Sequence, residues 1–159
     1  MPPIVLVTDR VRSGRVRLIR AVLKLSLKAV GRPECEVSVL ITNDAEMRSL
    51  NKMYRKIDRT TDVLSFPMDD RELLGDIVIS AEKVAAQAKE YGVGADSELT
   101  RVTVHGLLHL LGYDHVRGGR QSAKMKEKEA ALLEAVRRAG LLKRAGVHFE
   151  RRVRAFKRR

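Results

Sequence analysis

The segment that most constrains this chain lies between residues 105 and 115 and reads His-Gly-Leu-Leu-His-Leu-Leu-Gly-Tyr-Asp-His. Three of the four histidines lie in it, and the first two, His105 and His109, are four residues apart. On a helix this spacing places both imidazoles on one face, about one turn from each other. Gly112 can adopt the left-handed conformation that ends a helix, so the following turn can bring His115 back towards the other two. The segment therefore predicts a buried helix, a turn and a three-histidine metal site.

Three neutral imidazoles around one divalent cation leave a fourth position open, as a catalytic zinc site requires. The spacing is that of the metzincin pattern H-E-x-x-H-x-x-G-x-x-H, except that Gly106 stands where those peptidases have the glutamate that acts as general base. A glycine cannot accept a proton, which argues against a peptidase of that type. The alternative is that His105 and His109 pack a helix face and His115 ends a loop. Three histidines at this spacing favour the metal site.

The chain has 159 residues, the size of one ordinary domain. Its single cysteine, Cys35, excludes internal disulfides and is expected to be a small buried thiol. No apolar stretch approaches the roughly 20 residues needed to span a membrane. The first residues also lack the charged-then-apolar order of a signal peptide. We therefore expect a cytoplasmic protein without a membrane segment.

The net charge of +12 is concentrated in two segments. Residues 9–32 carry eight Lys/Arg and one Asp, a sum of +7, and residues 137–159 carry ten and one Glu, a sum of +9. The remainder, which includes the histidine motif, therefore sums to −4. Clustered positive charge attracts phosphate backbones, so we expect a polyanionic partner, although a solvated helix face explains part of the first segment. The low aromatic content of 4% argues against an RNA-recognition sheet that stacks bases on Phe and Tyr.

Hydrophobic periodicity predicts four strands and five helices. The strands are expected at residues 4–8, 36–42, 61–66 and 74–80. The helices are expected at residues 14–29, from a cap at Asn43 or Asp44 to about Tyr54, from Ser80 to about Tyr91, from a cap at Asp96 or Ser97 to about Leu111, and at residues 120–139. This alternation predicts a single small α/β (α+β) domain, with one sheet of about four strands packed by about five helices.

Three sequence blocks resemble the bacterial YbeY proteins. One is the histidine motif. The second is Leu50-Asn51-x-x-Tyr54-Arg55-x-x-Asp58-x-x-Thr61-Asp62-Val63-Leu64-Ser65-Phe66-Pro67, the third is Leu74-Gly75-Asp76-Ile77-Val78-Ile79, and Met125-x-x-x-Glu129 fits the helix after the motif. The resemblance covers about residues 35–138, with the blocks in the same order. Thr60 departs from it by standing where the family usually has proline, and the basic tail after residue 140 is longer than expected.

The family is described as metal-dependent endoribonucleases that act in rRNA maturation and ribosome quality control. The resemblance implies that His105, His109 and His115 bind one zinc ion per chain and that Arg55 belongs to the catalytic cleft. It also implies a single-strand-type endoribonuclease that acts on an RNA substrate, an rRNA precursor, with the ribosome or its small subunit as partner. Residues 1–142 would then form the nuclease domain and residues 143–159 a basic C-terminal tail.

The chemistry of these residues agrees with that expectation. Zinc can lower the pKa of bound water to about 7 without a protein base, and it can polarise a phosphoryl oxygen. The guanidinium of Arg55 is suited to holding a phosphate and to stabilising the charge added in the transition state. The alternative for Arg55 is a surface salt bridge with Asp58 or Asp62.

Other readings of the site remain open at this point. Asp114 can hold a histidine N–H or can simply stabilise the turn, and Tyr113 has the same two possible roles. Two rival functions are a zinc hydrolase of a non-nucleic substrate and a ribosome-assembly factor with a structural metal. The basic segments argue against the first rival, and the open coordination position argues against the second.

Overall fold

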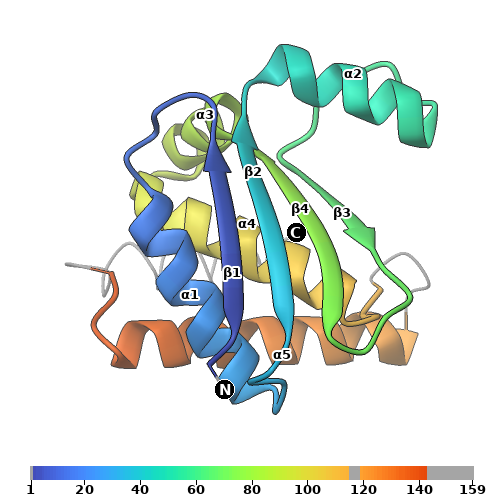
Figure 1. The fold of residues 1–159 in the computed structure, drawn as a ribbon. Coiled ribbons are helices and arrows are strands. Elements are labelled where there is room, and N and C mark those ends of the chain that lie inside the picture. The colour runs from blue at the N-terminus through green and yellow to red at the C-terminus, as the bar shows by residue number, and fades with distance from the viewer. Residues whose placement is uncertain (1, 115–118, 143–159) are drawn as a thin grey trace.

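The computed structural model describes residues 2–114 and 119–142. Over these ranges the elements are β1 (Ile4–Asp9), α1 (Val16–Ala29), β2 (Glu36–Thr42), α2 (Asp44–Arg55), β3 (Val63–Pro67), β4 (Leu73–Ser80), α3 (Ala81–Tyr91), α4 (Ala95–Leu110) and α5 (Gly119–Arg138) (Figure 1). The expected single α+β domain with four strands and five helices is confirmed. The tail at residues 143–159 lies outside the described residues.

The strands form one mixed sheet in the order β1-β2-β4-β3. β1, β2 and β4 are parallel, with Val7 opposite Val39 and Val39 opposite Ile77. β3 runs antiparallel to β4 and lies at the edge of the sheet. Its last residue is Pro67, which has no N–H to donate and is therefore suited to an edge strand.

Helices cover the two faces of the sheet unequally, and Figure 1 shows α4 and α5 behind the sheet and α2 above it. Along β4, Ile77 and Ile79 point into the core shared with α1, α3 and α4. Val78 points to the opposite face, where it packs with Met47 of α2. α5 forms an outer layer, joined to α1 and α4 by a second core of Val22, Val104, Leu108, Met125, Leu132, Leu133, Val136 and Leu142. Most of the α2 side of the sheet is left uncovered, and Leu6 on β1 is 53% exposed there.

The ends of α3 are those expected from the sequence, whereas the start of α4 is not. The hydroxyl of Ser80 accepts a hydrogen bond from the backbone N–H of Lys83 and so caps α3. The predicted cap of α4 at Asp96 or Ser97 is wrong, because the helix begins at Ala95 with Gly94 as its N-cap. Asp96 lies inside the first turn, where its charge still favours the helix dipole.

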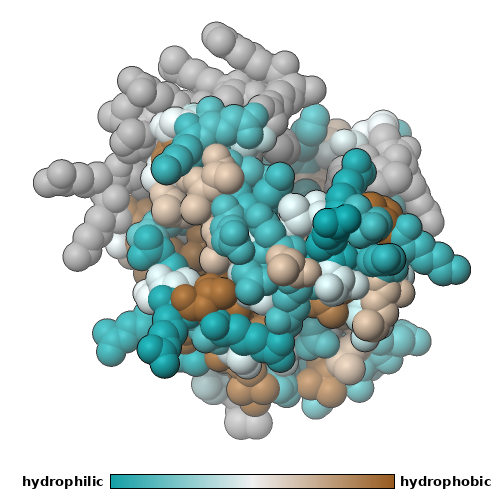
Figure 2. Space-filling view, turned by 90° about the horizontal axis from the view of Figure 1, so that it is seen from above, coloured by the Kyte–Doolittle hydropathy of each residue, from teal (hydrophilic) through white to brown (hydrophobic). Residues whose placement is uncertain are grey.

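Figure 2 shows hydrophilic side chains over most of the described surface seen from above, with smaller hydrophobic patches between them. No helix among residues 2–114 and 119–142 combines the length and apolarity that crossing a bilayer would need. Cys35 is fully buried, and its thiol donates to the carbonyl of Arg71 at 3.3 Å, which confirms the expected buried thiol.

Candidate functional site

The histidine motif lies on α4, which is buried on most of its circumference. Its fully buried residues include Val102, Val104, Leu107 and Leu108. They contact the sheet on one side and α5 on the other. His105 and His109 are half-buried on the remaining face. Because α4 is packed on both sides, the backbone positions of His105 and His109 are fixed relative to the sheet and to α5.

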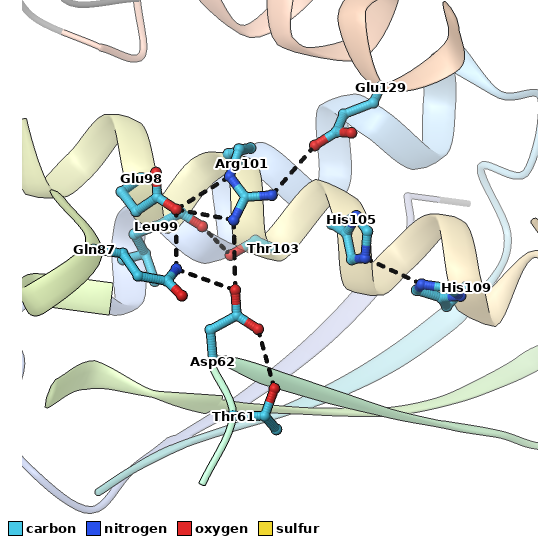
Figure 3. Close-up of polar contacts among 10 residues, drawn as sticks. All are labelled: Thr61, Asp62, Gln87, Glu98, Leu99, Arg101, Thr103, His105, His109 and Glu129. Carbon is cyan, nitrogen blue, oxygen red and sulfur yellow. Dashed lines mark hydrogen bonds and ion pairs between the residues drawn. The ribbon is translucent and has the colours of Figure 1, made fainter. Parts of the chain in front are cut away.

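The two imidazoles point towards one another (Figure 3). Nε2 of His105 and Nε2 of His109 are 3.1 Å apart, and the ring planes make an angle of 72°. A tetrahedral zinc ion with Zn–N bonds of about 2.0–2.1 Å places two ligand nitrogens roughly 3.3–3.4 Å apart. The pair therefore already has nearly the separation that one ion requires, and the donor set fits zinc.

The chain leaves α4 through the predicted glycine turn. Gly112 has a φ of +93°, and the backbone N–H of Tyr113 donates to the carbonyl of Leu108 at 3.0 Å. The ring of Tyr113 packs against the core between α4 and α5, which favours its structural role. His115 lies outside the described residues, so the structure brings together two of the three expected ligands. Within the described ranges, no group of three or more His, Cys, Asp or Glu side chains could hold a metal ion.

Gly106 is explained by the close approach of α4 to the sheet. A Cβ at this position would lie 2.9 Å from Cγ2 of Ile77 and 3.1 Å from Cγ2 of Val63. The hydroxyl of Ser65 donates to the carbonyl of Gly106 at 2.9 Å, which holds β3 against the helix. The glutamate of a metzincin would therefore not fit here unless α4 moved away from β3 and β4.

A buried network that the sequence analysis missed lies one turn before His105 (Figure 3). Arg101 is only 9% exposed. Its Nη2 is 2.9 Å from Oε1 of Glu98 and 3.4 Å from Oδ2 of Asp62, and its Nη1 is 3.7 Å from Oε1 of Glu129. Arg101 thus connects α4 to α5 and to the segment that enters β3.

The network places three carboxylates around one guanidinium. Burial by itself would lower the pKa of Arg101, but the attraction of Glu98, Glu129 and Asp62 outweighs it, and the pKa is raised. Arg101, His105 and His109 follow one another at intervals of four residues and so share one face of α4. The formal excess of negative charge beside the imidazoles favours a cation at the histidine pair.

A partial signal for this network was present in the sequence. Glu98 and Arg101 have the i,i+3 spacing at which helical side chains meet. The contributions of Asp62 and Glu129 depend on the packing of β3 and α5 against α4, which no local pattern indicates.

Arg55 is the last residue of α2, and its side chain is exposed. The two carboxylates considered as its partners are engaged elsewhere. Asp58 is paired with Arg48 at 2.8 Å, and Asp62 contacts Arg101. Within the described residues, neither carboxylate is paired with Arg55, so its guanidinium is available for a phosphate.

The loop between α2 and β3 is held at three points. The side-chain amide of Asn51 donates to the carbonyl of Arg59 at 2.9 Å. The hydroxyl of Thr60 donates to Asp44 at 3.1 Å, so the residue that replaces the family's proline ties the loop to the start of α2. Asp62 then joins the end of the loop to α4 through the buried network. These contacts give the loop after α2 a defined position relative to the histidine helix.

Comparisons with known proteins show which family this chain resembles over most of its length. The sequence profile of the family described as Endoribonuclease YbeY matches residues 8–137. A protein of that name from Aquifex aeolicus is 45% identical over 139 residues, which cover 85% of this chain and 93% of the relative. Another from Roseiflexus castenholzii is 49% identical over 111 residues, covering 64% and 70% of the two chains. A solution structure of a Thermotoga maritima protein has a TM-score of 0.64 and 29% identity, with 84% of this chain and 89% of that chain covered.

Proposed function

This chain belongs to the YbeY family of endoribonucleases, and we propose that it hydrolyses RNA phosphodiester bonds at a site where His105, His109 and His115 hold one zinc ion. The observation that carries the proposal is the 3.1 Å approach of the two Nε2 atoms on α4. Imidazole ligands suit zinc, and three of them leave a position open for catalysis. The absence of a carboxylate at Gly106 agrees with a nuclease and not with a metzincin-type peptidase.

Each protein group has a separate role in the proposed reaction. When bound, zinc supplies Lewis acidity and lowers the pKa of a water molecule to about 7. His105 and His109 orient the site, because α4 is held between the sheet and α5. Arg55 binds a phosphate oxygen and stabilises the negative charge that develops in the transition state.

We further propose that the substrate is an rRNA precursor, that the ribosome or its small subunit is the partner, and that the protein acts in the cytoplasm. The family resemblance and the net charge of +12 support this proposal. Arg12, Arg17 and Lys28, in and next to α1, are exposed and so can meet a polyanion. The rival function of a zinc hydrolase on a non-nucleic substrate explains neither the basic surface nor the family.

The test combines metal content with RNA cleavage. Protein purified without added metal should contain about one zinc equivalent per chain, and the zinc should be lost in His105→Ala. Cleavage should stop after metal removal by EDTA and in His109→Ala. Full cleavage in His109→Ala, or unchanged zinc content in His105→Ala, would contradict the proposed metal site.

Arg55 is tested against a matched arginine. Arg55→Ala should lower the rate of RNA cleavage roughly 100- to 1000-fold, the usual cost of one group that stabilises transition-state charge. Its melting temperature should stay close to that of wild type, because Arg55 is exposed. Arg59→Ala, which removes another exposed arginine from the loop that follows α2, is the control. Equal losses in both variants would show that Arg55 contributes general charge and no specific contact.

A further inference from the structure

The uncovered face of the sheet carries a groove of about 550 Å³ beside α2. Leu40, Leu50 and Val78 give it an apolar lining, Tyr54 and Phe66 contribute aromatic rings, and Asp76 contributes a carboxylate. The groove lies on the opposite side of β3 and β4 from α4, so it is separate from the histidine pair. Its volume and its mixture of apolar and polar groups are those of a small-molecule site.

Two aromatic rings form one wall of the groove. The ring centroids of Tyr54 and Phe66 are 5.2 Å apart in an edge-to-face contact. Tyr54 is 62% exposed, so its ring is held on one side and open to solvent on the other. The low aromatic content, with three tyrosines and three phenylalanines, argued against base stacking on the sheet, but the fold brings one ring of each kind together at this position. An exposed ring of this kind offers a stacking surface for a nucleobase.

The charges around the groove indicate which ligand it suits. The charged residues that line the groove are Arg10, Glu46 and Asp76. Arg55 directly follows Tyr54 at the end of α2 but is not among the residues that line the groove. The carboxylate of Glu46 at the groove is paired with Arg10. The Arg10–Glu46 pair leaves Asp76 as the unpaired charge of the groove lining, so the groove suits a neutral base that donates hydrogen bonds.

Asp76 provides a polar contact inside the groove. It is exposed, and it lies opposite Phe66 in the pairing of β3 with β4. Within the described part of the chain, its carboxylate has neither a hydrogen bond nor an ion pair. A carboxylate accepts hydrogen bonds from the N–H groups on the edge of an unpaired base.

The edge strand connects this groove to the histidine helix. Ser65 and Phe66 are neighbours on β3 and point to opposite faces of the sheet. Ser65 donates to the carbonyl of Gly106, the residue after His105, while Phe66 packs in the groove. No further strand lies outside β3 in the described sheet. A single strand of RNA can therefore pass around this edge from the groove to the histidine pair.

We propose that the groove binds one unpaired nucleobase of the RNA substrate, next to the position of cleavage. Tyr54 and Phe66 form the stacking surface, and Asp76 accepts from the edge of the base. This inference rests on the proposed function, because it gives the RNA substrate of that site a second contact on this chain. A base within a duplex is excluded, since its faces are stacked and its pairing edge is occupied.

The test uses the full chain as purified and a short fluorescein-labelled single-stranded RNA. In single-turnover cleavage, Tyr54→Ala should raise the half-saturating protein concentration roughly 5- to 150-fold, the loss expected for one base–aromatic stack. The maximal rate should change far less. Tyr54→Phe, which keeps the ring, should behave like wild type and shows that the site tolerates substitution. Met53→Ala is the matched control, since Met53 is 69% exposed and does not line the groove.

Equilibrium binding by fluorescence anisotropy in EDTA separates this inference from the catalytic proposal. Weaker single-strand binding by Tyr54→Ala supports the groove even if no variant cleaves RNA. Normal cleavage with unchanged RNA affinity in Tyr54→Ala would contradict nucleobase binding in the groove. It would leave the catalytic proposal intact. Nucleobase binding in the groove is also refuted if Tyr54→Ala weakens the binding of a duplex of the same sequence equally. The same holds if Met53→Ala loses as much single-strand affinity as Tyr54→Ala. A protein partner on this face would leave the RNA affinity of Tyr54→Ala unchanged.

Discussion

Replacing Arg101 by methionine should destabilise the protein strongly, because it leaves carboxylates uncompensated in the interior. Arg101 is 9% exposed, Glu98 is 0% exposed and Glu129 is 5% exposed. Removing one partner of a buried ion pair costs about 3–5 kcal/mol, since the remaining charge has lost its water and keeps no counter-charge. For a chain of this length, each kcal/mol lowers the melting temperature by about 2–4 °C. The expected fall is therefore roughly 6–20 °C.

The assay is thermal unfolding followed by circular dichroism, at neutral and at acidic pH. The deficit of Arg101→Met should shrink at acidic pH, because protonation removes the uncompensated charge. Arg138→Met is the control, since the Arg138 side chain is 78% exposed and pairs with Glu134 on the surface of α5. Exposed ion pairs contribute little, so this variant should melt close to wild type. Zinc content should also fall in Arg101→Met, because a shift of α4 moves His105 and His109.

One result would refute this reasoning. Buried ion networks can sometimes be replaced by well-packed apolar residues without loss. If Arg101→Met melts at or above the wild-type temperature and keeps its zinc, the network does not brace α4. Arg101→Lys sharpens the comparison, because it keeps the charge but loses the planar fork that contacts several carboxylates at once. It should therefore fall between wild type and Arg101→Met.

Three further predictions concern other parts of the chain. Gly106→Ala should lower the free energy of unfolding by about 1–3 kcal/mol, because its Cβ would lie 2.9 Å from Ile77; unchanged urea denaturation would show that α4 shifts without cost. Deleting residues 143–159 removes a charge of +7 and should reduce the log–log salt slope of RNA binding by about 0.7–0.9 per lost phosphate contact; an unchanged slope with a lower melting temperature would assign the tail to the fold. Hydrogen bonding to Arg137 lowers the pKa of Glu134 from 4.5 to about 2, so its contribution to stability is present above pH 4.5 and is lost as the pH falls towards 2. Glu134→Gln should therefore melt below wild type at neutral pH and equal it near pH 2, and a constant difference across that range would contradict the assignment.

The strands could be predicted because their short apolar runs are buried when they pair side by side in a sheet. Residues 36–42 form β2 as expected, since this central strand contacts β1 and β4 and contributes Val37, Val39 and Ile41 to the main core. The third strand begins at Val63 and not at residue 61. Asp62 instead directs its carboxylate to Arg101 and Gln87, so a polar tertiary contact decides the boundary.

The histidine pair could be predicted because its geometry depends only on one helix. The spacing of four residues determines which face of α4 carries His105 and His109, whatever the helix packs against. The reason for Gly106 could not be found in this way. It depends on how closely Ile77 and Val63 approach α4, and therefore on the pairing of β3 with β4.

The position of the whole site follows from the antiparallel edge strand. A chain that continued the parallel pattern would bring β3 into the sheet through a crossover helix, but β3 pairs with β4 as a hairpin at the edge. Its inner face then meets α4 through Ser65, while its outer face meets α2 through Phe66. The hydrogen bond from Ser65 to Gly106 thereby joins the second sequence block to the histidine motif, 41 residues later in the chain. The alternation of β3 therefore connects α2, which carries Arg55, to the helix that carries His105 and His109, and neither motif indicates this connection by itself.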